Sequence, residues 1–262
     1  MPVTPDERPL PVGPGNEVSL TVERFDDRVW RDEQLDPLFD GAFPAFITAD
    51  PVSAAYIGRV RECFTAFNIV LLDRGQRPAA VGWGVPIRWF GELHDLPIGY
   101  TDTTRRAVED QQAGRACDTF VICGGIVDRS RSRQGVAGQL ITALRDLAAT
   151  AKFPRVIAPV RPTQKSTYPL TPIETYAAWT REDGSPLDPW IRTHVRLGAR
   201  VIAMAPHSQT MVGTVDEWQS WTGLRLPSTG HYVIPDGLAP LYIDREHDVG
   251  TYTEPNVWVR HR

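Results

Sequence analysis

The sequence predicts a mixed α/β fold built as one continuous domain. Apolar residues gather in short or alternating runs that are typical of strands. An amphipathic helix is predicted between two buried strands, at residues 119–127 and 155–160. With 262 residues, 42% hydrophobic and 23% charged, the chain is long and apolar enough to bury a core. No internal repeat or linker divides it.

The N-terminal half predicts strands and helices in the following order. Residues 18–25 alternate between apolar and polar side chains and predict the first strand. Residues 30–66 predict helices that are interrupted at two prolines. Two apolar runs within 68–87 flank the polar turn 73–76 and predict a hairpin. A helix follows at 101–112.

The C-terminal half begins with the strand 119–127, a helix at 136–151 and the strand 155–160. These two strands are expected to be parallel because a helix joins them. The helix predicted at 189–197 has a proline in its first turn and Gly198 at its end. The later elements are expected to be strands at 201–205, 209–212 and 241–244, and a short helix at 216–222.

The predicted domain organisation is an N-terminal arm followed by one domain, which contains an insertion and a C-terminal extension. Residues 1–17 are rich in proline and charge and are expected to form an N-terminal arm. Residues 18–262 form the single domain. Within it, 161–188 is expected to be an insertion of loops and one short helix, and about 213–262 a C-terminal extension.

Composition excludes several classes of protein. A net charge of −4 without a long Lys/Arg run argues against nucleic-acid binding. The apolar runs are too short to span a membrane, and the N-terminus lacks the apolar core of a secretory signal. The 3 cysteines match no metal motif and are a poor disulfide framework. We therefore expect a cytoplasmic protein without a metal site.

The strongest motif is the run VDRSRSRQGVAGQL at residues 127–140. A strand enters a tight turn, and the turn opens an amphipathic helix, so several backbone N–H groups and the positive helix end face one point. Gly135 allows a close approach to a phosphate, and Arg131 and Arg133 can add positive charge. On spacing alone, an ordinary strand–turn–helix with a solvated turn remains an equal alternative.

The same run resembles the acyl-CoA signature of the GNAT (general-control N-acetyltransferase) superfamily, Gln/Arg-x-x-Gly-x-Gly/Ala. The signature maps onto residues 132–137, and Ser132 departs from its first position. Downstream, residues 194–199 resemble the family pattern Tyr-x-x-x-Gly-Phe, with His194 in place of the tyrosine. The chain is also similar to a group of actinobacterial GNAT proteins. In order of elements, the resemblance covers residues 18 to about 211.

The resemblance implies a mostly antiparallel sheet with one splayed parallel pair, flanked by helices. It implies acetyl-CoA, or another acyl-CoA, as co-substrate. By resemblance, His194 would protonate the leaving thiolate. The residues expected to bind the acyl-CoA are Gly125, Ile126, Val127, Arg131, Ser132, Arg133, Gln134, Gly135, Val136, Ala137 and Gly138.

Several of these assignments have an alternative. A neutral His194 could act as a base, or could be a hydrogen-bonded core histidine. The pair Gly124-Gly125 could leave room for the acceptor or the acyl group, or could mark a strand bulge. Arg161, Lys165 and Tyr168 follow a parallel strand and could bind a carboxylate or phosphate of the acceptor, or could be a solvated loop.

The function expected from this sequence is acyl-CoA-dependent N-acylation of a small-molecule amine by direct attack on the thioester. The rivals are another reaction on the same fold, such as O-acylation or a reaction without acyl transfer, and a non-catalytic acyl-CoA sensor. Turnover of acetyl-CoA with a panel of amines separates enzyme from sensor. A homodimer is compatible with the sequence.

Overall fold

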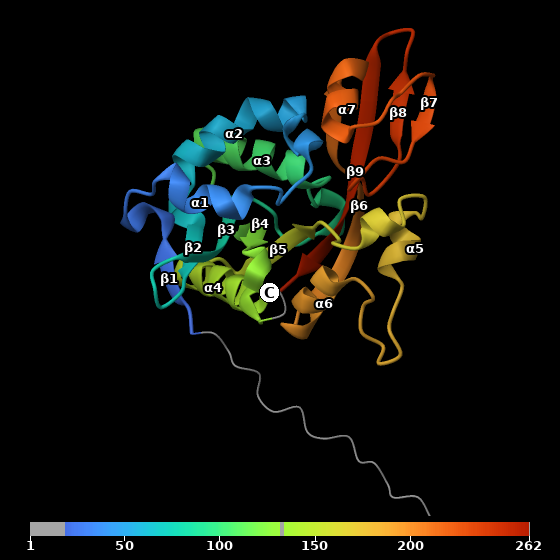
Figure 1. The fold of residues 1–262 in the computed structure, drawn as a ribbon. Coiled ribbons are helices and arrows are strands. Elements are labelled where there is room, and N and C mark those ends of the chain that lie inside the picture. The colour runs from blue at the N-terminus through green and yellow to red at the C-terminus, as the bar shows by residue number, and fades with distance from the viewer. Residues whose placement is uncertain (1–18, 132–133, 262) are drawn as a thin grey trace, which may run out of the picture.

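The computed structural model describes residues 19–131 and 134–261 (Figure 1). The strands are β1 (Thr21–Arg24), β2 (Asn68–Leu72), β3 (Pro78–Ile87), β4 (Thr119–Val127), β5 (Arg155–Val160), β6 (Arg200–Gly213), β7 (Gly230–Tyr232), β8 (Leu241–Asp244) and β9 (Val249–Arg260). The α-helices are α1 (Asp32–Phe39), α2 (Pro51–Cys63), α3 (Tyr100–Gln112), α4 (Val136–Thr150), α5 (Ile173–Ala177), α6 (Pro189–Arg196) and α7 (Val215–Thr222). Short 3-10 helices are η1 (Phe25–Asp27), η2 (Ala45–Thr48), η3 (Thr65–Phe67), η4 (Leu93–Asp95), η5 (Arg129–Arg131) and η6 (Lys165–Thr167).

The strands of the described residues form one nine-stranded sheet in the order β1-β2-β3-β4-β5-β9-β8-β7, with β6 paired to β9. The pair β4–β5 is parallel, and the other pairs in this sheet are antiparallel. β5 and β9 pair between Ile157↔Arg260 and Val160↔Val257. The last strand of the chain therefore lies between β5 and β6. Its place in the sheet was not anticipated from the sequence.

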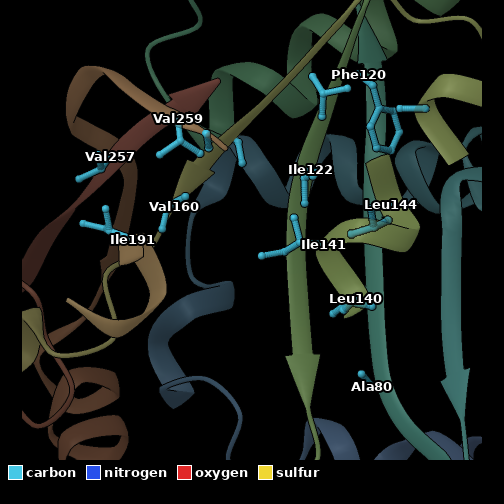
Figure 2. Close-up of a cluster of buried hydrophobic side chains, with 14 of the residues drawn as sticks. Ala80, Phe120, Ile122, Leu140, Ile141, Leu144, Val160, Ile191, Val257 and Val259 are labelled. Carbon is cyan, nitrogen blue, oxygen red and sulfur yellow. The ribbon is translucent and has the colours of Figure 1, made fainter. Parts of the chain in front are cut away.

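Helices cover both faces of the sheet, as predicted (Figure 1). On one face, Val60 of α2 and Val108 of α3 share a core cluster with Val121 of β4. On the other face, α4 packs Leu140 and Leu144 against the sheet, together with residues that include Ala80, Phe120 and Ile122 (Figure 2). Successive side chains of β4 point alternately into the two core clusters, as expected for a strand that is buried on both faces.

Most predicted elements are confirmed within a residue or two. The hairpin, the strands β4 and β5, and the helices α3, α4, α6 and α7 lie where the pattern places them. In α6, Asp188 caps the first turn by accepting from two backbone N–H groups, and Gly198 follows the helix with a φ of 88°. The strands expected at 201–205 and 209–212 are one strand, β6, with an irregularity between Ala205 and Gln209.

The C-terminal part projects from the main sheet as a lobe made of α7, β7, β8 and the adjoining ends of β6 and β9 (Figure 1). Its core contains the buried Trp218 and Tyr252 together with Phe46 from η2. The phenylalanine connects the lobe to the N-terminal half of the chain. None of the helices in the described part of the chain is long and apolar enough to cross a membrane.

Candidate active site

The parallel pair separates after its first three residue pairs. β4 and β5 pair from Thr119↔Arg155 to Val121↔Ile157. β4 then continues to Val127, whereas β5 continues to Val160 alongside β9. Figure 2 shows the two strands diverging between the labelled Ile122 and Val160. Among the described residues, one edge of β4 therefore has no partner strand beyond Val121, which is the predicted splay.

Two backbone donors of β4 point to this open edge. The Asp128 N–H donates to the Ala79 oxygen of the neighbouring β3 side at 2.9 Å. Because backbone groups alternate in direction along a strand, Ile126 also directs its N–H towards β3, and Gly125 and Val127 direct theirs to the open edge. Of the three β4 residues expected to bind the acyl-CoA, Gly125 and Val127 thus have their N–H groups on the open edge.

The first turn of α4 presents further backbone donors. Gly135 precedes the helix with φ 78°, a left-handed conformation that favours glycine, and within the described residues no side chain caps the helix. Gln139 donates the first intrahelical bond, to the Gly135 oxygen. The N–H groups of Val136, Ala137 and Gly138 therefore have no acceptor within the helix. A Cβ at Gly135 or Gly138 would meet no atom of the described part of the chain within 4 Å. The positive helix end is therefore open to an anion.

The cationic side of the turn is engaged within the protein. Arg131 Nη2 donates to Asp73 Oδ2 at 2.5 Å, and its Nε lies 3.5 Å from Asp128 Oδ2. The exposed Gln134 donates its N–H to the Arg131 oxygen at 3.3 Å. Ser132 and Arg133 lie outside the described residues. Arg131 thus joins the turn to the β2–β3 hairpin.

β4 has a bulge at the point where it leaves β5. Trp83 is opposite Gly124 and Gly84 is opposite Ile122, so Cys123 is the extra residue. The Trp83 ring covers Gly124, because a Cβ there would lie 2.1 Å from Trp83 Cζ2. The glycine pair therefore belongs to a bulge, and an indole fills the room at Gly124. Burial raises the pKa of the Cys123 thiol to about 12, so Cys123 is protonated near neutral pH.

Tyr100, the first residue of α3, reaches the same bulge. The Tyr100 N–H donates to Ser208 Oγ at 2.9 Å, and Gly99 packs so closely on Ser208 that a Cβ would lie 2.2 Å from its Cα. The Tyr100 side chain packs against the cluster that contains Cys123. Burial is the main cause of its raised pKa, the Cys123 thiol adds to it, and a hydrogen bond from Trp83 lowers it. A protonated phenol therefore lies beside the bulge at neutral pH.

His194 is buried in α6 and pairs with a second histidine. Its Nδ1 lies 2.8 Å from His261 Nε2, and its ring meets the edge of Trp190. Burial, with a smaller effect of His261, lowers the pKa of His194 to about 3. His194 is therefore neutral at pH 7, and the imidazolium that proton donation needs is absent. This geometry corresponds to the hydrogen-bonded core histidine, and a catalytic role of the neutral ring stays a prediction.

Arg161 forms a bidentate ion pair with a buried carboxylate. Its Nε and Nη2 donate to the two oxygens of Glu254 at 2.8 and 3.1 Å, and Nη2 also donates to the Asp236 oxygen at 2.9 Å. Glu254, fully buried in β9, also accepts from the Tyr252 hydroxyl at 3.1 Å. Most of the Arg161 charge is thus neutralised within the protein.

Lys165 is buried rather than exposed to an open loop. Its Nζ donates to the backbone oxygens of Tyr168 and Leu238 at 2.7 and 2.6 Å, and it therefore ties the insertion to the C-terminal lobe. Burial lowers its pKa to about 8. Tyr168 is 41% exposed, and its ring meets the edge of Trp179. Of the three residues expected to contact the acceptor, only Tyr168 leaves much of its side chain accessible.

Sequence reasoning missed two residues that the structure brings to the site, Asp73 and Tyr100. Asp73 was assigned to a hairpin turn, and its bond to Arg131 joins residues 58 positions apart. Tyr100 was placed just outside the predicted helix, and its anchor Ser208 is 108 positions away. Long-range contacts of this kind have no local pattern. The small residues at 82, 84, 124 and 125 were the available signal, since glycines in facing strands mark a close approach of bulky groups.

Comparisons with known proteins agree on the class of protein. No family model matches the chain. The chain is 30% identical over 263 residues to the arginine N-acetyltransferase avaD of Aspergillus versicolor, covering 88% of this chain and 91% of that protein. The loading GNATL domain of CurA from Lyngbya majuscula has a similar fold, with a TM-score of 0.58, 14% identity, and coverage of 93% of this chain and 97% of that one.

The fold is also similar to that of the GphF GNAT-like decarboxylase in complex with isobutyryl-CoA. The TM-score is 0.51 with 15% identity, covering 89% of this chain and 97% of that one. The splayed parallel strands and the bulge lie in a fold that this chain shares with both of these structures. The 30% identical relative shows that this chain belongs to the GNAT superfamily and is an N-acetyltransferase.

Proposed function

We propose that this enzyme transfers the acetyl group of acetyl-CoA to the amino group of a small molecule, and that arginine is the first acceptor to test. The choice of arginine rests on the 30% identical relative, whose name states that activity. A small acceptor is also in keeping with the structure near the end of β5. There Lys165 joins the insertion to the C-terminal lobe. The observation that carries the donor assignment is the set of backbone N–H groups, on the open edge of β4 and in the first turn of α4, to which the described strands and helices bring no backbone partner.

The donor would be held almost entirely by backbone groups. The N–H groups of Val136, Ala137 and Gly138, with the positive end of α4, suit the pyrophosphate. The N–H groups of Gly125 and Val127 suit the carbonyl oxygens of the pantetheine arm and of the thioester. In this proposal the arm follows the open edge of β4 towards the bulge at Cys123, and the thioester lies beside Tyr100.

The reaction proposed is direct attack by a neutral amine. The amine nitrogen forms a bond to the carbonyl carbon, and a backbone N–H of β4 stabilises the oxyanion. As the C–S bond breaks, the Tyr100 phenol gives its proton to the sulfur, and the phenolate regains a proton from the acylated nitrogen, directly or through water. Tyr100 is proposed for this role because its phenol is protonated at neutral pH and lies against the cluster that contains Cys123 of the bulge.

Arg161, Lys165 and Tyr168 remain the proposed contacts of the acceptor. Nε and Nη2 of Arg161 are bonded, and Nη1 is the guanidinium nitrogen for which the described residues provide no bond. Nη1 could bind a carboxylate of an amino-acid acceptor, and the partly exposed ring of Tyr168 could pack on its aliphatic part. Lys165 would act through the loop carbonyls that it holds.

The test is turnover of acetyl-CoA, measured as free thiol release, with arginine, other amino acids and aliphatic amines. Mass spectrometry of the product must find an acetyl group on the amine. Thiol release without an N-acetyl product would indicate another reaction of the fold. Binding of CoA without thiol release for any amine would favour the sensor.

A further inference from the structure

Asp73 connects two turns that are far apart in the sequence. It lies at the end of the β2 strand, and its Oδ1 accepts the N–H groups of Gly75 and Arg77 at 2.8 and 3.0 Å. Its Oδ2 accepts from Arg131 Nη2 at 2.5 Å and from Arg77 Nε at 3.3 Å. The side chains of Asp73 and Arg131 are 8% and 16% exposed, so this contact is mostly shielded from water.

Arg131 lies at the centre of the turn that precedes α4. Its N–H donates to the Asp128 oxygen at 2.9 Å, and its own oxygen accepts from Gln134 at 3.3 Å. The guanidinium extends away from these bonds to the hairpin. Arg131 therefore fixes the turn from within through its backbone and from outside through Asp73.

The position of Asp73 is unexpected on electrostatic grounds alone. A carboxylate close to an anion site repels the anion. The backbone hydrogen bond from Arg77 is the main reason that the pKa of Asp73 is lowered to about 2, and the side-chain bond from Arg131 contributes. Asp73 is thus ionised throughout the neutral range and offsets the charge of Arg131. Such a residue favours anion binding only if the free energy gained from a well-positioned turn exceeds the repulsion between its charge and the anion.

We propose that Asp73 is a positioning residue, which holds Arg131, and through it Gln134 and the first turn of α4, in the arrangement that receives the pyrophosphate of CoA. The inference rests on the proposed function, in which that turn binds the pyrophosphate. A turn held in place before binding loses less conformational freedom when the ligand arrives. The brace comes from the hairpin, which is not part of the phosphate motif.

The experiment compares the dissociation constants of CoA and pantetheine, by calorimetry, in the wild type and Asp73→Asn. Asparagine retains the Oδ1 acceptor for the hairpin turn and removes the closer of the two carboxylate charges on Arg131, leaving that of Asp128 at 3.5 Å. We expect CoA binding about tenfold weaker in the variant, with pantetheine binding unchanged, because pantetheine lacks the pyrophosphate. Arg77→Gln is the matched control, since it removes the other cation on Asp73 and should leave CoA binding unchanged.

The sign of the effect decides between the two physical accounts. If Asp73 only opposes the phosphate charge, Asp73→Asn binds CoA more tightly or equally well, and the proposal is wrong. Equal weakening of CoA and pantetheine would indicate a general structural defect and would also overturn it. A wild-type protein that binds both ligands equally would contradict the pyrophosphate assignment itself, and thus the proposed function.

A double-mutant cycle supplies an independent measurement. If Asp73 acts through Arg131, the double variant Asp73→Asn/Arg131→Gln binds CoA no more weakly than Arg131→Gln alone. If the effects of the two substitutions multiply, the residues act separately and the brace is refuted. Chemical denaturation of each variant verifies folding before binding is measured, and if Asp73→Asn fails to fold, Asp73→Ser replaces it in both experiments.

Discussion

The two strands that separate at the candidate site use different chemical groups. On the β4 and α4 side, the groups available to a ligand are backbone N–H groups, those of Gly125 and Val127 and those of the first turn of α4. On the β5 and β9 side, the polar groups are side chains that bond within the protein. Arg161 pairs with Glu254, and Lys165 donates to two backbone oxygens.

Backbone N–H groups and charged side chains differ in what determines whether they are available to a ligand. A backbone donor at a strand edge or a helix start is exposed by the secondary structure, and it is satisfied only if another backbone segment or a capping group arrives. A charged side chain takes whichever partner the tertiary structure offers. A ligand site is therefore more secure to infer from backbone geometry than from nearby Arg or Lys residues.

The largest expected effect concerns Tyr100, at the junction of the two sides. Loss of a general acid costs about 10² to 10⁴ in rate, and we expect Tyr100→Phe to lower kcat by about 10³ with acetyl-CoA. With acetyl-seleno-CoA the defect should largely disappear, because a selenolate leaves without a proton. Tyr242→Phe, on the exposed part of β8, is the control and should retain full activity. An equal defect with both donors would remove Tyr100 from the proton transfer.

The next largest effect tests the β4 and α4 side. Gly135→Asp places a carboxylate and a strained left-handed residue at the open helix start, and we expect at least about 100-fold weaker CoA binding by calorimetry. Gly223→Asp is the matched control, because Gly223 itself has a left-handed conformation, φ 70°, with no described atom within 4 Å of its Cβ position. It lies after α7 and should leave CoA binding unchanged. Unaltered binding in Gly135→Asp would refute the pyrophosphate assignment.

The third prediction addresses the β5 and β9 side. Glu254→Gln leaves Arg161 without its ionic partner, and breaking a buried pair typically costs about 3 to 5 kcal/mol. Arg161 keeps 25% of its side chain exposed, so solvent offsets part of the loss and we expect about 2 kcal/mol in the free energy of unfolding. Urea denaturation measures it. A variant of unchanged stability would mean that Arg161 is free to serve a ligand.

The sequence predicted the backbone of the site well. Strand β4, helix α4 and their connecting glycine follow from local periodicity and turn chemistry, which depend on neighbours in the chain. The splay came from the family resemblance and is confirmed by the three-residue pairing of β4 with β5. The place of β9 was missed, because a strand near the chain end reveals its partner only in three dimensions.

Side-chain roles were less predictable than the backbone. Arg131, Arg161 and Lys165 were assigned to ligands from their positions after strands. The structure gives each a partner distant in sequence, namely Asp73, Glu254 and the Leu238 oxygen. No local pattern encodes those partners, so the charge of a residue alone could not reveal whether it was free.

The smallest expected effect distinguishes the two roles of His194. Its pKa is about 3 in the folded protein, and that of His261, lowered by burial and by Arg145, is about 4, against about 6.5 for an unperturbed histidine. The unfolded chain therefore binds more protons between about pH 6.5 and 4. Stability is complete above pH 7 and falls with decreasing pH, by about 1.4 kcal/mol per pH unit for each such histidine.

His194→Gln should therefore reduce the dependence of the unfolding free energy on pH between 6.5 and 5, measured by urea denaturation, by about half. His231→Gln, on the exposed face of β7, is the control and should leave that dependence unchanged. At pH 7.5 we expect His194→Gln to retain kcat within about threefold, because the ring carries no proton to donate there. A tenfold or larger fall in kcat, with CoA binding unchanged, would instead assign the neutral imidazole a part in catalysis.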